Sequence, residues 1–106
     1  MGEALKRKDY LSLLSKTKQK KKRDLLIDYA SKQDIVAIQE IVYNLMYGSI
    51  PLTSSQKRTL SKYQQTLREI IRKSTSVKHK KQVLKQEGGF LPTLIPIALS
   101  VLSSLL

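Results

Sequence analysis

Apolar residues recur at three- and four-residue spacing between Asp34 and Tyr47, and this periodicity constrains the fold more than any other feature of the sequence. The recurring residues are Ile35, Ile38, Ile41, Val42, Leu45 and Met46. Such spacing places side chains on one face of an α-helix. Asp34 is suited to be its N-cap, with Ser31 as an alternative start, and Gly48 follows as a stop. We therefore predict an amphipathic helix over residues 34–47.

A second helix is predicted after a turn at residues 49–52. Thr53-Ser54-Ser55-Gln56 has the pattern of a capping box, in which hydroxyl and amide side chains satisfy free backbone groups. We expect this helix to continue to Lys85, and its apolar side is formed by Leu60, Tyr63, Leu67, Ile70 and Ile71. Helices joined by a short turn usually lie antiparallel, and residues 24–31 would cover them as a third, shorter helix.

The fold class predicted from these patterns is all-α, a small helical hairpin or three-helix unit. A chain of 106 residues can bury only a small core. The apolar stripe is therefore expected to form that core, and the alternative is that part of it is the seam of a homo-oligomer.

Charge divides the chain into blocks. The net charge is +7 over residues 1–23, −3 over 24–50 and +8 over 51–87, and residues 88–106 carry no charged side chain. The expected organisation is a basic N-terminal arm (1–23), a helical basic domain (24–87), and a Gly-Gly junction with a hydrophobic C-terminal tail (88–106). Self-repulsion among its cations predicts that the arm is disordered when free.

The formal net charge of +12 indicates a polyanionic partner. Cationic side chains displace condensed counterions from phosphates, so nucleic acid, and double-stranded DNA in particular, is the first candidate and an anionic membrane surface the second. The sequence shows no helix-turn-helix signature, and its few aromatic residues are assigned to the predicted helices rather than to a stacking platform. This favours sequence-independent binding through phosphates, and the predicted contacts are Lys16, Lys18, Lys20, Lys21, Lys22, Arg23, Lys57, Arg58, Lys62, Arg68, Arg72, Lys73, Lys78, Lys80, Lys81 and Lys85.

Several functional classes are disfavoured by the residues that the chain lacks. It has no Cys, and its single His, His79, stands within a run of lysines. A zinc finger needs four Cys or His ligands and is excluded. No Ser-His-Asp set, carboxylate pair or phosphate-binding Gly-rich loop is recognisable, so we expect neither an enzyme nor a bound metal or cofactor.

The uncharged segment 88–106 has the length of a bilayer-spanning helix but an irregular pattern. A helix of 19 residues extends about 28 Å, near the thickness of a bilayer core. However, Pro96 would kink or break a helix begun earlier, and hydroxyl residues would follow one side of it. We expect interfacial, membrane-active contact, with a true membrane anchor and packing against protein as the alternatives. The predicted membrane residues are Phe90, Leu91, Leu94, Ile95, Ala98 and Leu102.

The Gly-Gly junction carries a resemblance to a viral family. Residues 85–97, Lys-Gln-Glu-Gly-Gly-Phe-Leu-Pro-Thr-Leu-Ile-Pro-Ile, resemble the C-terminal part of adenovirus precursors of core protein X (mu). There a basic region ends in Gly-Gly before an Ile-Leu-Pro-Leu-Leu-Ile-Pro-Leu type segment. The chain is also similar to short basic proteins of the Polinton and adintovirus group. In those proteins a Leu-Thr-x-x-Gln-Lys stretch, here residues 52–57, precedes a basic region and the same tail.

This resemblance implies a virion core or minor capsid protein that is packaged with DNA and helps to condense it. It also implies a cut by a viral cysteine protease between Gly89 and Phe90, so that Gly88, Gly89 and Phe90 form the processing site; the alternative is a flexible hinge after a helix. The implied location is the virion core and, before assembly, the nucleus. Two other functions stay open: a membrane-associated basic protein, and a helical interaction module that binds a capsid protein.

Overall fold

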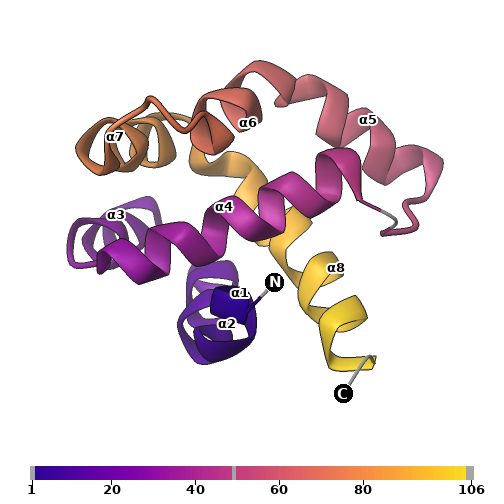
Figure 1. Cartoon of the computed structure of the whole chain (residues 1–106), viewed down its shortest axis with the longest axis horizontal. Helices are drawn as coiled ribbons and strands as arrows, with labels where there is room; N and C mark the ends of the chain where they lie inside the picture. Colours follow the sequence, from indigo (N-terminus) through magenta and orange to yellow (C-terminus); the bar gives the residue numbers. More distant parts are fainter. Residues whose placement is uncertain (1, 49, 105–106) are drawn as a thin grey trace.

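A computed structural model describes residues 2–48 and 50–104 of the chain, with side chains up to Val101. Over this part the fold is all-helical, as predicted. In chain order the elements are α1 (Gly2–Lys6), α2 (Lys8–Lys16), α3 (Lys20–Asp28), α4 (Lys32–Tyr47), α5 (Ser54–Lys62), α6 (Gln64–Ile71), α7 (Val77–Glu87), a 3-10 turn η1 (Gly88–Phe90) and α8 (Leu91–Ser104) (Figure 1).

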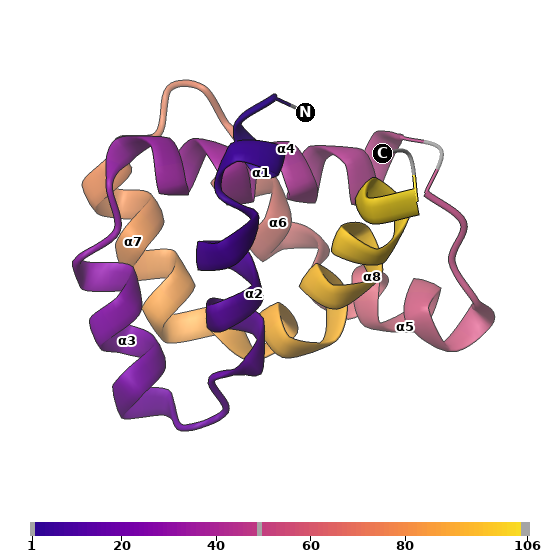
Figure 2. The same cartoon turned by 90° about the horizontal axis from the view of Figure 1, so that it is seen from below.

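Helix α4 is the central element of the molecule. It crosses the whole fold, and α1, α2, α6, α7 and α8 all pack against it (Figures 1 and 2). The side chains of its apolar stripe are buried, apart from the partly buried Met46, so the prediction that this stripe forms the core is confirmed. The radius of gyration is 12.5 Å, close to the value of about 13 Å expected for a compact domain of 100 residues.

The start of α4 is fixed by Ser31, the alternative N-cap, and not by Asp34. Ser31 Oγ accepts a hydrogen bond from the Asp34 N–H at 3.1 Å, and Asp34 Oδ2 accepts one from the Ser31 N–H at 2.9 Å. Both residues therefore serve one reciprocal capping box. At the other end, Gly48 is the C-cap, as predicted, and its N–H donates to the Asn44 carbonyl at 2.9 Å.

The capping box predicted at Thr53 is also present. Thr53 Oγ1 accepts from the Gln56 N–H at 3.2 Å, and Gln56 Oε1 accepts from the Thr53 N–H at 2.8 Å. The helix that it begins does not continue to Lys85, because the chain bends at Tyr63, between α5 and α6, and leaves the helical conformation at Arg72. Hydroxyl residues follow, which compete with helical hydrogen bonds, and Ser76 caps a new helix, α7.

This bend changes the predicted hairpin. Helix α6 packs against α4 through Leu67 and Ile70, whereas α5 buries no residue. The predicted third helix over 24–31 is displaced toward the N-terminus, as α3, and it packs against α7.

The N-terminal arm is not disordered, which corrects the prediction made from its charge. Its residues form α1, α2 and the first turn of α3, and Ala4, Leu11 and Leu14 are fully buried. Helix α1 packs on α4 and α2 packs on α8, so contacts distant in sequence supply the burial that offsets charge repulsion. The repulsion is further reduced by the pair Lys20–Asp24, whose Nζ and Oδ2 atoms lie 2.6 Å apart.

The uncharged C-terminal segment forms α8, and the helix continues through Pro96, so the break that the sequence allowed there does not occur. Proline removes one helical hydrogen bond, at a cost of about 3 kcal/mol. Pro96 lies on the exposed side of α8, while Leu94, Ile95 and Ala98 are buried against α2 and α4. This burial offsets the cost. The side chain of Leu102 lies outside the described residues.

Candidate nucleic-acid interface

The predicted phosphate contacts separate into two groups in the structure. The first group is exposed, and within the described part of the chain the side chains of its members have no ion-pair or hydrogen-bond partner: Lys16, Lys18, Lys21, Lys22, Lys57, Arg58, Lys62, Arg68, Lys73 and Lys78. One of them, Lys62, holds its ammonium 5.6 Å from the centre of the Tyr63 ring. This group has the exposure and charge that phosphate binding requires.

The second group is occupied in holding the fold together. The Lys81 ammonium donates to the carbonyls of Asp28 at 3.0 Å and Ala30 at 2.7 Å. Because the last carbonyls of a helix have no partner within it, Lys81 caps the C-terminal end of α3. Beside it, Lys85 Nζ forms a 2.7 Å ion pair with Asp28 Oδ1. These two lysines join α7 to α3.

Two further members of the second group are buried. Only 4% of the Lys80 surface is exposed, and burial lowers the pKa of its ammonium. Arg23 is 9% exposed, and its Nε lies 3.6 Å from the position that a Cβ atom would occupy if Gly88 had a side chain. The remaining members, Lys20 and Arg72, are exposed but pair with Asp24 and Glu69. The structure thus places Lys80 and Arg23 where they do not face solvent.

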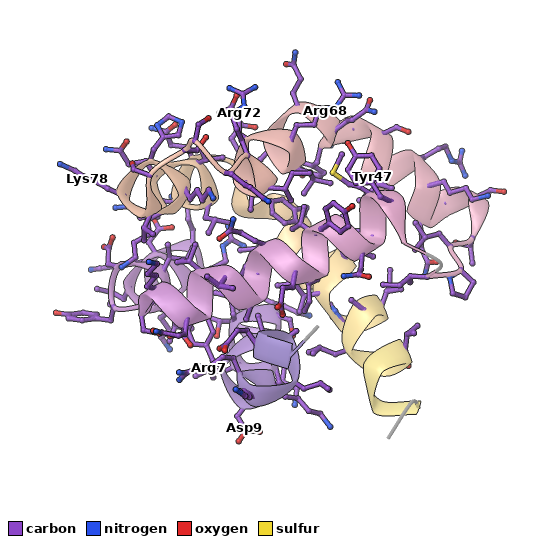
Figure 3. The ribbon with its side chains drawn as sticks, viewed as in Figure 1. Arg7, Asp9, Tyr47, Arg68, Arg72 and Lys78 are labelled. Carbon is purple, nitrogen blue, oxygen red and sulfur yellow. The ribbon has the colours of Figure 1, made fainter. Side chains whose placement is uncertain are left out.

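A polar groove of about 530 Å³ runs between α6 and α7. Its lining includes Lys62, Arg68 and Arg72, together with Gln65, Gln86 and the acids Glu69 and Glu87. The acids are occupied: Glu69 pairs with Arg72 at 3.3 Å, and Glu87 Oε2 accepts from the Thr66 hydroxyl at 3.0 Å. Arg68 and Arg72 project from the top of the molecule in Figure 3, and Lys78 projects from its left edge, on α7. This α6–α7 surface is the part of the predicted interface that the fold brings together.

A second basic surface lies between α2 and α8. Lys8, Lys16 and Lys18 border a hollow of about 460 Å³ whose floor includes Pro96 and Leu99. The sequence prediction missed Lys8. Lys8 and Lys16 stand eight residues apart, which places both on one side of a helix. That spacing can be read from the sequence, but it brings the two lysines to one side only if the arm is helical.

The predicted processing site is folded. Gly88 and Phe90 are buried within η1, and only Gly89 is exposed. Proteases bind their substrates as extended segments, so residues 88–90 would have to leave this 3-10 turn before a cut. The hydroxyl of Tyr63 closes the space next to Gly89.

The predicted membrane residues are also part of the fold. Phe90, Leu91, Leu94, Ile95 and Ala98 are each at most 1% exposed. Among the described residues, no helix combines the length and the apolar character needed to cross a bilayer. Contact between these side chains and lipid would require α8 to separate from α2 and α4.

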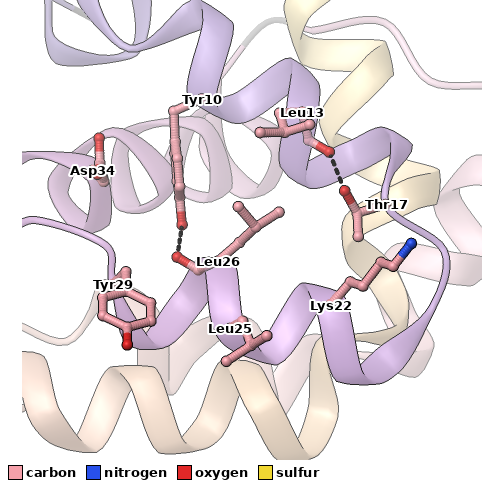
Figure 4. Close-up of a pocket in the computed structure, with 8 residues that line it drawn as sticks. All are labelled: Tyr10, Leu13, Thr17, Lys22, Leu25, Leu26, Tyr29 and Asp34. Atoms are coloured by element: carbon pink, nitrogen blue, oxygen red, sulfur yellow. Dashed lines mark hydrogen bonds between the residues drawn. The ribbon is translucent and has the colours of Figure 1, made fainter.

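An apolar hollow of about 520 Å³ lies between α2 and α3 (Figure 4). Its wall includes Leu13, Leu25 and Tyr29, which are 53%, 51% and 87% exposed. The Tyr10 hydroxyl donates to the Leu26 carbonyl at 3.0 Å inside it. Burial, and to a lesser degree the charge of Asp34, raise the pKa of the Tyr10 phenol. The lining is apolar, which suits a hydrophobic side chain of a partner.

Exposed aromatic residues are a feature that the sequence prediction missed. Tyr43 and Tyr47 follow each other at four-residue spacing on the side of α4 opposite to its apolar stripe, and both face solvent. The prediction assigned the aromatic residues to helices, and this pair does lie on α4, but its rings are exposed. Their position outside the stripe was the signal that could have identified them.

Comparison with known proteins gave no match: no protein-family model, no curated protein and no solved structure is significantly similar to this chain.

Proposed function

We propose that this protein binds nucleic acid, duplex DNA in the first place, through phosphate contacts and without reading sequence. The resemblance of the Gly-Gly junction extends the proposal to a role as a core or minor capsid protein of an adenovirus-related DNA element, with the virion core and the nucleus as its locations. The observation that carries the proposal is the set of exposed, unpaired cations on α5, α6 and the α2–α3 corner.

Helix α5 supports this proposal most directly. It buries no residue, so packing does not explain why its surface carries Lys57, Arg58 and Lys62. All three are exposed, and the helix has no acidic residue to neutralise them. The capping box at Thr53 stabilises the helix locally. A helix of this kind is suited to lie along a phosphate backbone.

The test is a salt series of duplex DNA binding with the full chain. Each neutralised phosphate contributes about 0.9 to the slope of log Kobs against log salt concentration. We expect the triple variant K57Q/R58Q/K62Q to lower this slope by 1 to 3 phosphate equivalents, on the order of 0.9 each. The matched control is K57R/R58K/K62R, which keeps the charge and is expected to keep the slope.

Two results would refute the proposal. One is a full chain that does not bind duplex DNA even at low ionic strength. The other is a glutamine variant that binds with the same slope as the unchanged protein. Much tighter binding of one duplex sequence than of others would indicate recognition of bases instead of phosphates.

The processing step implied by the resemblance is part of the same proposal. A cut between Gly89 and Phe90 would detach α8, whose residues fill the core. Since Gly88 and Phe90 are buried, cleavage is expected to require local opening of η1. Incubation with the cysteine protease of such an element, at rising urea concentrations that the protease tolerates, is expected to yield a product ending at Gly89 at increasing rate. A chain that is opened by urea and still not cut there contradicts this step.

The apolar hollow between α2 and α3 favours a second candidate function, the binding of a capsid protein. Leu13, Leu25 and Tyr29 stand exposed around it, and Lys22 lies at its border. A second copy of the chain is disfavoured as the occupant, since each copy carries a charge of +12. An apolar segment flanked by acidic residues fits both the lining and the charge. Co-sedimentation with a capsid shell, lost in Leu25→Glu and retained in the exposed control Lys78→Glu, is the expected result; equal loss in both contradicts it.

A further inference from the structure

The solvent-facing side of α4 carries two tyrosines that are not part of the hydrophobic core. Tyr43 is 55% exposed and Tyr47 is 58% exposed, although α4 is the central helix of the core. Their ring centres are 5.3 Å apart, and the ring planes are tilted by 55°. Tyrosine side chains of a helix at the centre of a fold would normally add to its buried surface. These two leave ring surface available to solvent.

The two rings stand along the seam between α4 and α6, with a hollow beside each. A hollow of about 320 Å³ beside Tyr43 is lined by residues of α4 and by Ile71 and Lys73. A smaller one of about 100 Å³ beside Tyr47 is lined by Leu60, Gln64 and Arg68, among others. Figure 3 shows Tyr47 on the same side of the molecule as Arg68. Each tyrosine therefore has a cation and a partly enclosed space next to it.

The charges around the pair suit an anionic ligand. Arg68 and Lys73 are exposed and have no ion-pair or hydrogen-bond partner in the described residues. Glu40 is the acid that lines the larger hollow, and its Oε2 accepts the Ala4 N–H at 2.8 Å. On α6, Glu69 is engaged by Arg72 at 3.3 Å. Glu40 keeps its negative charge in this hydrogen bond, so Arg68 and Lys73 carry two positive charges against one, and the net charge beside the rings is positive.

We propose that Tyr43 and Tyr47 form a stacking site for unpaired bases of a single-stranded nucleic acid, with Arg68 and Lys73 binding the adjacent phosphates. Aromatic rings beside a basic groove are the arrangement by which proteins hold single strands, because every base offers a face for stacking. Bases within a duplex have both faces covered and cannot use such rings. Since the two rings are tilted, they take separate bases. This inference rests on the proposed nucleic-acid binding and adds a preference for single strands at this face.

The test compares a labelled oligothymidylate with a duplex of the same length, measured by fluorescence anisotropy with the full chain at fixed salt. Replacing either tyrosine, as Tyr43→Ala or Tyr47→Ala, is expected to weaken single-strand binding by about 5-fold or more. Duplex binding should change by less than about 2-fold. The matched control is Tyr29→Ala, since Tyr29 is 87% exposed but lies at the end of α3.

A second readout separates stacking from a change in fold. The chain has five tyrosines and no tryptophan, so its intrinsic fluorescence reports on tyrosine alone. Oligothymidylate is expected to quench this fluorescence in the unchanged protein and in the Tyr29 variant, and much less in a Tyr43→Ala/Tyr47→Ala double variant. Circular dichroism of that variant, with an unchanged helical spectrum, excludes unfolding as the cause.

The outcomes distinguish this inference from the function on which it rests. Salt-dependent duplex binding together with single-strand binding that is independent of both tyrosines overturns the inference and leaves the proposed function intact. Equal losses of single-strand and duplex binding in the tyrosine variants also overturn it. A chain that binds neither form overturns both.

Discussion

The hydroxyl oxygen of Tyr63 lies 2.7 Å from the position that a Cβ atom would occupy on Gly89. The Tyr63 ring also packs against Phe90, with ring centres 5.7 Å apart. Tyr63 is the residue at which the chain bends between α5 and α6, and Gly89 lies between α7 and α8. No glycine in the described residues has a positive φ, so Gly89 is needed here for space and not for backbone conformation.

Gly89→Ala is expected to displace the Tyr63 side chain and to destabilise the protein by about 1 kcal/mol, the lower end of the cost of overpacking, because Gly89 is exposed. Tyr63→Phe removes the hydroxyl that the new methyl group meets, so the double variant should recover part of this loss. Urea unfolding followed by circular dichroism measures both. Gly2→Ala is the control, because nothing lies within 4 Å of the position of a Cβ atom there. Additive effects of Gly89→Ala and Tyr63→Phe would contradict this account.

Leu94→Ala is expected to cost about 2–5 kcal/mol, as truncation of a buried leucine usually does. Leu94 is fully buried in α8, and the neighbouring Thr93 is exposed. Thr93→Ala is therefore the control and should change the free energy of unfolding by less than about 0.5 kcal/mol. Chemical denaturation of the full chain gives both values. Similar stabilities for the two variants would mean that α8 is not part of the folded core.

Lys81→Met should lower stability by about 1.5–3 kcal/mol, since hydrogen bonds from a charged donor to the two carbonyls at the end of α3 are lost. Lys78→Met, on the exposed side of the same helix, should leave stability nearly unchanged. Duplex DNA binding should show the opposite effect of the two substitutions. In the Lys78 variant the slope of log Kobs against log salt concentration falls by about 0.9, and in the Lys81 variant it does not change. Thermal melts and salt titrations of the two variants check the prediction. A Lys81 variant that is stable but binds DNA poorly would reassign this lysine to the interface.

Stability should decrease above about pH 10 partly because of Tyr10. Burial and the nearby Asp34 raise the pKa of Tyr10 in the folded protein, whereas a tyrosine in the unfolded chain ionises near its ordinary pKa. The contribution of Tyr10 is therefore complete below that ordinary pKa and is lost as pH rises toward the folded value.

Tyr10→Phe isolates this effect from the titration of lysines in the same range. The variant loses the hydrogen bond to the Leu26 carbonyl, so at neutral pH it should be less stable by about 1 kcal/mol. Its stability should then fall less steeply than that of the unchanged protein above pH 10. Urea midpoints measured for both proteins between neutral and strongly alkaline pH test this, and parallel curves would exclude Tyr10 as the titrating group.

Helix α4 and the capping box at Thr53 could be predicted from the sequence, because periodicity and capping are properties of neighbouring residues. The choice between Ser31 and Asp34 could not be made, since the capping box uses both. The helical arm was missed for a different reason. Leu11 and Leu14 are buried because other parts of the chain lie against them, and α2 packs on α8.

The candidate interface shows the same division between local and distant causes. Lysines in a basic run look alike in sequence, and only the fold separates Lys81, which caps α3, from the exposed Lys78. The partners of Lys81 and Lys85 are Asp28 at the end of α3 and Ala30 just after it, more than 50 residues earlier in the chain. Charge alone therefore predicts a polyanionic partner, but it does not show which cations are available for binding.

The packing of α2 against α8 also determines when this chain can fold during its synthesis. The surface that buries Leu11 and Leu14 includes a helix that is translated some 80 residues later. Until α8 leaves the ribosome, the leucines of α2 lack this partner, and the emerging polypeptide presents a basic, partly apolar surface. Folding is thus expected to complete only after α8 has emerged. Before that point, the exposed basic and apolar surface of the nascent chain is suited to bind chaperones or ribosomal RNA.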